Sequence, residues 1–286
     1  MATIFLKRTA TALVLLLACV ACTGVFFHPL PTLVRTPADI GLQYRDIDIQ
    51  GEAGRLHGWY LPARGKAFGT VLYAHGNAEN LSTHIGGVYW LPAAGFNVII
   101  FDYRGYGRSE GEPSARGLVD DTRAFIQYAQ TLPEAQAGGL VVYGHSLGGS
   151  VLISAVAGME DTGGIRGMII ESAFSNYRRI AREKLSQFWL TSLLQWTAYL
   201  LVTGEPDPLK DIARIEGIPM LIIHSRNDEV IPFSHGPALF AAANEPKQHW
   251  WLEDRHHNQG MNDDQRRQFA GYLRAMFQTG SLESVE

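Results

Sequence analysis

The sequence predicts an α/β fold in which helices cover both faces of a mostly parallel sheet. From residue 70 onward, short continuous apolar segments of strand length alternate with helical stretches, as is typical of buried parallel strands. One such segment ends in a glycine-rich turn that has Ser146 at its centre. With 286 residues and 46% hydrophobic content, the chain can bury this sheet within one domain.

The chain begins with a segment at residues 1–22 that is typical of targeting or membrane anchoring. Two basic residues precede an uncharged apolar stretch, and Ala-Cys-Thr-Gly follows this stretch as a lipoprotein cleavage site would. We therefore expect Cys22 to become the lipidated first residue of the mature protein, with Cys19 as a less favoured site. An uncleaved membrane helix is the alternative, because the stretch is about long enough to span a bilayer. Residues 23–39 contain several prolines and are predicted to form an extended linker.

The remaining residues, 40–286, are predicted to form the α/β domain. The segments 42–50 and 56–61 indicate an antiparallel hairpin at the sheet edge, since the first of them alternates apolar and polar residues. The predicted parallel strands are 70–74, 97–101, 140–143, 167–170, 220–223 and 249–252. The predicted helices are 81–94, 115–132, 147–159, 237–244 and 263–278.

One insertion, at about residues 174–208, does not follow this alternation. It is rich in Leu, Phe, Trp and Tyr and comes directly after a predicted strand. We expect a small helical cap over the site, and for its first half an ordinary core helix with a connector is an equal alternative. Residues 190–201 are too continuously apolar to be exposed to water, so they are predicted to cover another apolar surface or to touch a membrane.

The Gly-His-Ser-Leu-Gly motif at residues 144–148 is typical of a nucleophile elbow. In such a turn a serine links a strand to a helix, and only small neighbours fit around it. The motif alone is a weak signal. The apolar strand before it and the apolar, uncharged helix after it strengthen the prediction that Ser146 is a nucleophile.

Two further residues complete the arrangement that a serine nucleophile needs. Asp228 follows one predicted strand and His257 follows the last one, so each of the three residues lies beyond the C-terminal end of a parallel strand. Serine needs a base to remove its proton, and the imidazole needs a carboxylate that fixes its tautomer. Glu171 is a less favoured candidate for the acid, and His256 for the base.

A site for the negative charge of a tetrahedral intermediate is predicted at the turn of residues 73–78. This turn ends the first central strand in a glycine, so a backbone N–H can face Ser146. We assign the two oxyanion donors to the N–H groups of Asn77 and Leu147. His75, at the strand end, is expected to support the turn rather than to act as a base.

Together these motifs resemble the α/β-hydrolase superfamily of serine hydrolases from about residue 40 to the end. They are His-Gly-Asn-Ala at 75–78, Asp-Tyr-Arg-Gly-Tyr-Gly-Arg-Ser at 102–109, the elbow at 144–149, Asp-Glu-Val-Ile-Pro at 228–232 and His-Asn at 257–258. The combination is most similar to a membrane-tethered branch that includes eukaryotic protein depalmitoylases and many bacterial hydrolases. The resemblance implies an eight-stranded, mostly parallel sheet, a triad of Ser146, Asp228 and His257, and no cofactor. The branch usually has glycine before the triad histidine and aspartate two residues after it, where this chain has His256 and Gln259.

The composition excludes several other classes of function. A formal charge of −4 leaves no basic face for nucleic acid. Both cysteines lie in the first 22 residues, so the predicted domain has no disulfide and no cysteine metal site, and the adjacent histidines are a poor metal pair. We expect a small-molecule or lipid acyl ester as substrate, cleaved at a membrane surface of the bacterial cell envelope. A peptidase or amidase with the same triad, or a catalytically silent binding protein, are the alternatives.

Overall fold

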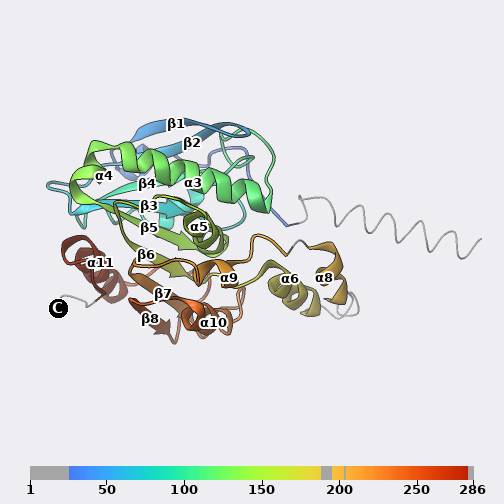
Figure 1. Cartoon of the computed structure of the whole chain (residues 1–286). Coiled ribbons are helices and arrows are strands. Elements are labelled where there is room, and N and C mark those ends of the chain that lie inside the picture. Colours follow the sequence, from blue (N-terminus) through green and yellow to red (C-terminus); the bar gives the residue numbers. More distant parts are fainter. Residues whose placement is uncertain (1–25, 188–194, 203, 283–286) are drawn as a thin grey trace, which may run out of the picture.

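A single sheet of eight strands forms the centre of the molecule, in the order β1-β2-β4-β3-β5-β6-β7-β8 (Figure 1). The computed structural model describes residues 26–187, 195–202 and 204–282. Neighbouring strands from β4 to β8 are parallel, and β2 is antiparallel to both of its neighbours. The strands are β1 (Arg45–Gly51), β2 (Gly54–Leu61), β3 (Gly69–Ala74), β4 (Phe96–Phe101), β5 (Leu140–His145), β6 (Ile165–Glu171), β7 (Met220–Ser225) and β8 (Lys247–Leu252). The predicted α/β-hydrolase sheet with an antiparallel edge is confirmed.

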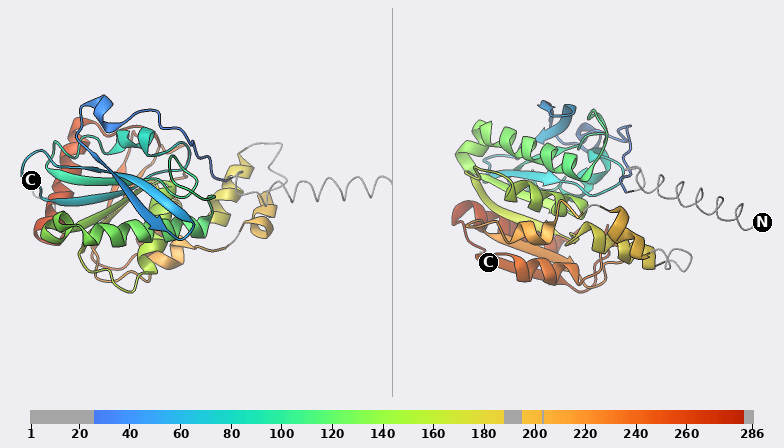
Figure 2. Two further views of the ribbon diagram at one scale, coloured as in Figure 1. Left: turned by 90° about the horizontal axis from the view of Figure 1, so that it is seen from above. Right: turned by 45° about the vertical axis from the view of Figure 1, so that its right-hand side comes forward.

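Helices cover both faces of the sheet, because successive strand residues point to opposite sides (Figure 2). On β3, Leu72 and Ala74 pack into one apolar cluster, while Val71 and Tyr73 pack into the other. One face carries α3 (Ala115–Thr131), α5 (Leu147–Ala157), α9 (Pro208–Ile212) and α10 (His235–Ala242). The opposite face carries α2 (Leu81–His84), the 3-10 turn η3 (Ile85–Gly87) and α11 (Asp263–Gln278). The short helix α4 (Pro133–Gly138) follows α3.

The helix expected over residues 81–94 is much shorter in the structure. It ends after α2 and η3, where Gly86 and Gly87 disfavour further helix and the chain continues in turns. Gly87 also lies against the ring of Tyr73, whose hydroxyl oxygen would be 3.1 Å from an added Cβ. Close packing on the strand therefore fixes this turn.

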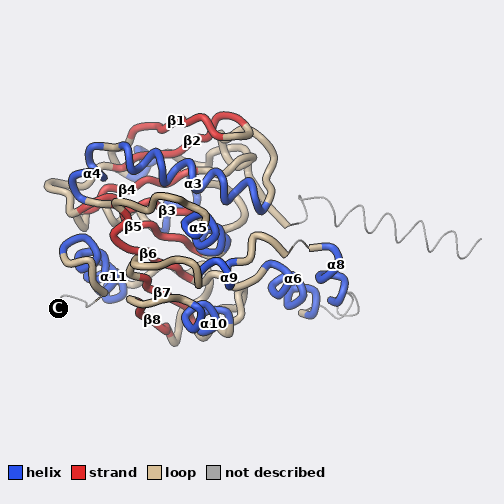
Figure 3. Tube along the Cα trace, in the orientation of Figure 1, coloured by secondary structure: helices blue, strands red, loops and turns tan. Residues whose placement is uncertain are grey.

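The cap region lies between β6 and α9 and contains α6 (Tyr177–Ser186), the 3-10 turn η4 (Gln195–Thr197) and α8 (Ala198–Leu201). These helices project from the end of the sheet where β6 ends, as the tube view makes plain (Figure 3). Residues 188–194 and 203 of the predicted cap lie outside the described residues. Within the described part, Trp196 is 63% exposed and Tyr199 is 44% exposed, so these two aromatic side chains are not covered by the domain.

The segment expected to be an extended linker packs against the folded body from Phe26 onward. Phe27 is 4% exposed and belongs to the main apolar cluster, and Pro29 forms a β-bridge with Glu79. The sequence pattern missed this docking because proline-rich chain without hydrophobic periodicity gives no signal of packing. The predicted N-terminal segment, residues 1–22, lies outside the described residues. Among the described helices, none combines the length and apolar character needed to cross a bilayer.

Candidate active site

Ser146 lies at the sharp turn between β5 and α5. Its backbone has φ 57° and ψ −121°, a conformation that L-residues rarely adopt and that costs roughly 1–3 kcal/mol. Two glycines make room for this turn. A Cβ on Gly144 would lie 2.6 Å from the carbonyl oxygen of Gly148, and a Cβ on Gly148 would collide with the carbonyl oxygen of Ala74 on β3. The Ser146 N–H donates to the carbonyl of Glu171 at 2.8 Å, which ties the turn to β6.

Ser146, His257 and Asp228 form a continuous run of hydrogen-bonding contacts. The Oγ of Ser146 is 2.9 Å from Nε2 of His257, and Nδ1 of the same ring is 2.7 Å from Oδ2 of Asp228. The three side chains come from the loops after β5, β8 and β7, and all three residues are buried. The common edge at which parallel strands end brings them together although 111 residues separate Ser146 from His257.

The surroundings of Asp228 keep its carboxylate ionised. Burial alone would raise its pKa, but the hydrogen bond and charge of His257, together with backbone N–H donors, outweigh burial and lower the pKa below its ordinary value. Oδ1 accepts from the N–H groups of Val230 at 2.9 Å and Ile231 at 2.7 Å. The Asp-Glu-Val-Ile-Pro motif thus folds into a loop whose own N–H groups hold the carboxylate. Oδ2 is left to face His257.

The two alternative residues point elsewhere. Glu171 lies in a buried network in which it pairs with Arg255 and accepts a hydrogen bond from Tyr143, and no contact joins it to His257 among the described residues. The ring of His256 is 71% exposed and contacts Glu229 at 3.2 Å. Geometry therefore favours Asp228 over Glu171 and His257 over His256.

The turn expected to supply an oxyanion donor lies directly beside Ser146. A Cβ built on Gly76 would be 3.5 Å from the Cβ of Ser146, so Asn77 is one residue from the nearest approach to the serine. Neither the N–H of Asn77 nor that of Leu147 donates a hydrogen bond to any group in the part of the chain that the structure describes. Both groups are free to donate to a bound oxygen.

His75 belongs to the framework of this turn. Its ring is fully buried, with Nδ1 2.8 Å from the carbonyl of Gly76 and Nε2 3.3 Å from Oδ1 of Asp102. The same carboxylate oxygen accepts from the N–H of Leu81 at 2.7 Å, and Tyr103 donates to the His75 carbonyl at 2.8 Å. Asp102 and Tyr103 belong to the glycine-rich motif at 102–109, which thus supports the turn.

Sequence reasoning missed three groups around the site. The Arg255–Glu171–Tyr143 network joins the loop that carries His257 to β6 and β5, and the side chain of Asn77 binds the N-terminal segment. His145, next to Ser146, is 8% exposed, and its Nε2 is 3.2 Å from the carbonyl of His257. Burial lowers the pKa of His145 to about 4, so this ring is neutral at pH 7. Its place within the elbow motif was the only available signal.

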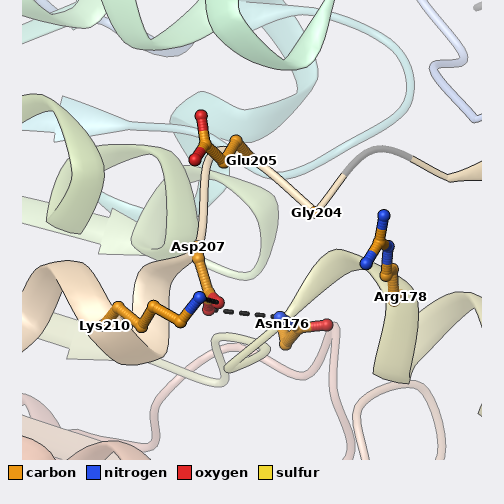
Figure 4. Close-up of a pocket in the computed structure, with 6 residues that line it drawn as sticks. All are labelled: Asn176, Arg178, Gly204, Glu205, Asp207 and Lys210. Carbon is orange, nitrogen blue, oxygen red and sulfur yellow. Dashed lines mark hydrogen bonds and ion pairs between the residues drawn. The ribbon is translucent and has the colours of Figure 1, made fainter. Parts of the chain in front are cut away.

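A polar hollow of about 360 Å³ lies at the base of the cap and is separate from these residues (Figure 4). Asn176 bonds to Asp207 at 3.1 Å there, and Lys210 pairs with the same carboxylate at 3.4 Å. Its charged lining and its position suit a junction between cap and domain rather than an acyl site. No group of His, Cys, Asp and Glu side chains suited to a metal ion occurs among residues 26–187, 195–202 and 204–282.

The sheet topology and the site at its carboxyl edge define an α/β-hydrolase. The serine aminopeptidase S33 family matches residues 65–214, about half of the 286-residue chain. The chain belongs to this family of hydrolases.

Relatives and solved structures agree with this assignment. The protein YfhR of Escherichia coli is 38% identical over 216 residues, which are 73% of this chain and 71% of YfhR. The α/β-hydrolase domain-containing protein WAV2 of Arabidopsis thaliana is 31% identical over 73% of this chain and 69% of WAV2.

Two solved structures share the fold at low identity. The esterase Pf2001 of Pyrococcus furiosus superposes with a TM-score of 0.67 at 20% identity, over 87% of this chain and 97% of the esterase. Acetyl xylan esterase 1 of Thermoanaerobacterium superposes with a TM-score of 0.63 at 21% identity, over 82% and 84% of the two chains.

Proposed function

We propose that this protein is a serine hydrolase that cleaves carboxylic esters or thioesters through an acyl-enzyme on Ser146. The observation that carries the proposal is the run of contacts from Asp228 through His257 to the Oγ of Ser146, at 2.7 and 2.9 Å. These distances lie within the range at which a base can take a serine proton.

Each residue has a definite step in this reaction. Nε2 of His257 takes the proton of Ser146 as Oγ attacks the carbonyl carbon, and Asp228 stabilises the imidazolium through Nδ1–H. The N–H groups of Asn77 and Leu147 donate to the oxyanion of the tetrahedral intermediate. The imidazolium then gives its proton to the leaving oxygen or sulfur. A water activated by His257 hydrolyses the acyl-enzyme in the second half.

Esterases are among the solved structures that share the fold, and the resemblance to depalmitoylases extends the proposal to thioesters. The membrane tether at Cys22 or at an uncleaved helix is part of this proposal.

A peptidase or amidase is the second candidate, because the matching family is described as a serine aminopeptidase. The acylaminoacyl peptidase of Pyrococcus horikoshii also shares the fold, with a TM-score of 0.60 at 14% identity over 86% of this chain and 43% of that one. A catalytically silent binding protein is disfavoured, because such a protein would have no need to keep the contacts of Ser146 and His257.

Labelling with a fluorophosphonate tests the nucleophile. We expect wild-type protein to be labelled at Ser146, and Ser146→Ala and His257→Ala to lose ester hydrolysis by about 10⁴-fold or more. The matched control is His256→Ala, which removes the neighbouring exposed imidazole and should change the rate less than threefold. Full turnover in well-folded Ser146→Ala would refute the proposal, and loss in His256→Ala with an active His257→Ala would move the base to His256.

A substrate panel separates the two candidate activities. Acyl esters and thioesters of graded chain length are compared with aminoacyl amides on the same labelled enzyme. The ester proposal expects the largest kcat/KM for an ester or thioester, and a larger kcat/KM for an aminoacyl amide would support the peptidase.

A further inference from the structure

The N-terminal segment from Phe26 to Val34, here named the strap, lies along the turn that carries the expected oxyanion donor. The Leu30 N–H donates to the carbonyl of Glu79, and the Glu79 N–H donates to the carbonyl of His28, both at 2.9 Å. The strap is thus paired with the turn as a short added strand would be. Its outer end is fixed by the Val34 N–H, which donates to the Ser82 hydroxyl at 2.9 Å.

The side chain of Asn77 joins the strap to the turn. Its Nδ2 donates to the carbonyl of Phe26 at 2.6 Å, while its Oδ1 accepts from the His28 N–H at 3.2 Å. Oδ1 also accepts from the Tyr106 hydroxyl at 2.8 Å and from the Ala78 N–H at 2.9 Å. One amide therefore contacts the strap, the 102–109 motif and its own turn, within one residue of the closest approach to Ser146.

The turn needs such support because its backbone is strained. Ala78 has φ 69° and Glu79 has φ 57°, values that non-glycine residues adopt only when the surroundings hold them there. Asn80 adds a second link, because its Nδ2 donates to the carbonyls of Leu30 and Thr32, each at 2.8 Å. Without the strap, the four hydrogen bonds that the Asn77 and Asn80 side chains make with it and the two Glu79 backbone bonds would be lost.

The strap also reaches the cap. The ring of Phe26 lies 5.6 Å from that of Tyr177, the first residue of α6, and Phe27 is buried in the main apolar cluster. The same nine residues therefore contact both the turn and the base of the cap. They begin four residues after Cys22, the last residue of the predicted N-terminal segment.

We propose that the strap is a structural part of the active site and that the Asn77 side chain is a positioning residue, which fixes the Asn77 N–H as an oxyanion donor. The inference rests on the proposed function, since it concerns the donor of that reaction. A donor acts on the transition state only when it is held where the oxyanion forms, so a loosened turn lowers kcat while substrate binding stays unchanged.

The test uses full-length protein and normalises rates to active sites titrated with a fluorophosphonate. Asn77→Ala keeps the backbone N–H and removes the side-chain link, and Leu30→Pro removes the N–H that donates to Glu79. Arg35→Pro is the control, because the exposed Arg35 lies just beyond the strap and its N–H has no partner among the described residues. Affinity for a trifluoromethyl ketone, which forms an oxyanion on Ser146, is measured alongside kcat and KM.

We expect Asn77→Ala and Leu30→Pro to lower kcat about 10-fold to 100-fold with KM within twofold, since loss of a whole donor costs about 10²–10³-fold. The trifluoromethyl ketone should bind more weakly in proportion, and Arg35→Pro should match the wild type. A wild-type kcat in Asn77→Ala, or a lower kcat without weaker ketone binding, would overturn the inference. If Leu30→Pro does not fold, Asn77→Ala alone tests the inference. A wild-type protein that is not labelled at all would refute the proposed function instead.

Discussion

Several buried histidines among the described residues are held in the neutral state by the fold, and His145 and His235 are two of them. Burial lowers the pKa of His145 and of His235 to about 4. At His235 a neutral ring is also required by its contacts, because Nδ1 accepts from the Ser175 N–H at 2.9 Å, while Nε2 lies 2.8 Å from Glu183 on α6. Protonation of Nδ1 would remove that acceptor.

This predicts a loss of stability in acid. An unfolded histidine titrates near 6.5, so between about pH 6.5 and 4 the unfolded state binds more protons, and stability falls as pH falls through that window. For His235 the loss from pH 7 to pH 5 is about 2 kcal/mol. Denaturant unfolding at both pH values should show that His235→Asn, whose amide oxygen can still accept from Ser175, loses about 2 kcal/mol less than the wild type. The exposed control His256→Asn should follow the wild type, and equal pH dependence in all three proteins would contradict the explanation.

At the level of single residues, the sequence predicted the members of the candidate site but not their support. Ser146, Asp228 and His257 could be found because each follows a strand, and parallel strands end at one edge. The Arg255–Glu171–Tyr143 network could not be predicted from the sequence. Its members are 28 or more positions apart, and their pairing depends on side-chain conformations. Which of His256 and His257 faces inward depends likewise on the path of a short loop.

At the level of elements, the elbow is the most constrained part of the fold. Gly148, the second residue of α5, lies against the carbonyl groups at the end of β3, and an added Cβ would collide with the backbone there. Backbone cannot move aside as a side chain can, so the helix would have to shift away from the sheet and carry Ser146 with it.

We therefore expect Gly148→Ala to lower activity at least 10-fold and to destabilise the protein by about 1–3 kcal/mol, as overpacking of a filled core does. The control is Gly86→Ala, at a position where an added Cβ meets nothing within 4 Å and φ is not positive. Thermal melting and ester turnover of the two variants check this. Equal behaviour of Gly148→Ala and Gly86→Ala would show that the elbow has more room than the structure indicates.

Strands and long helices were easier to predict than short ones. The boundaries of α11 match the expected residues 263–278, because an amphipathic pattern and an asparagine cap with Gln265 mark them. The small helix α9 was missed since five residues show no period. The docked strap was missed for the same reason, as its bonds use mainly backbone groups.

At the level of the whole molecule, the proposed attachment at Cys22 gives a testable arrangement. Mass spectrometry of the mature N-terminus should find a lipid-modified Cys22 in the membrane fraction, and Cys22→Ala should release the protein. Hydrolysis of a soluble ester should stay unchanged in that variant, because the described contacts of the strap with the site involve Phe26 and later residues. Intact residues 1–21 in the membrane fraction would indicate an uncleaved helix, and an unmodified N-terminus in the soluble fraction would indicate secretion.

The docked strap also limits how far the catalytic edge can travel from a bilayer. Four Cα–Cα steps separate Cys22 from Phe26, so with lipid on Cys22 the fixed end of the strap stays within roughly 14 Å of its attachment point. A hydrolase attached by so short a segment would meet acyl esters in the membrane by lateral diffusion in two dimensions. Its turnover of such substrates would then follow their density in the leaflet, and dilution of the surrounding solution would leave it unchanged.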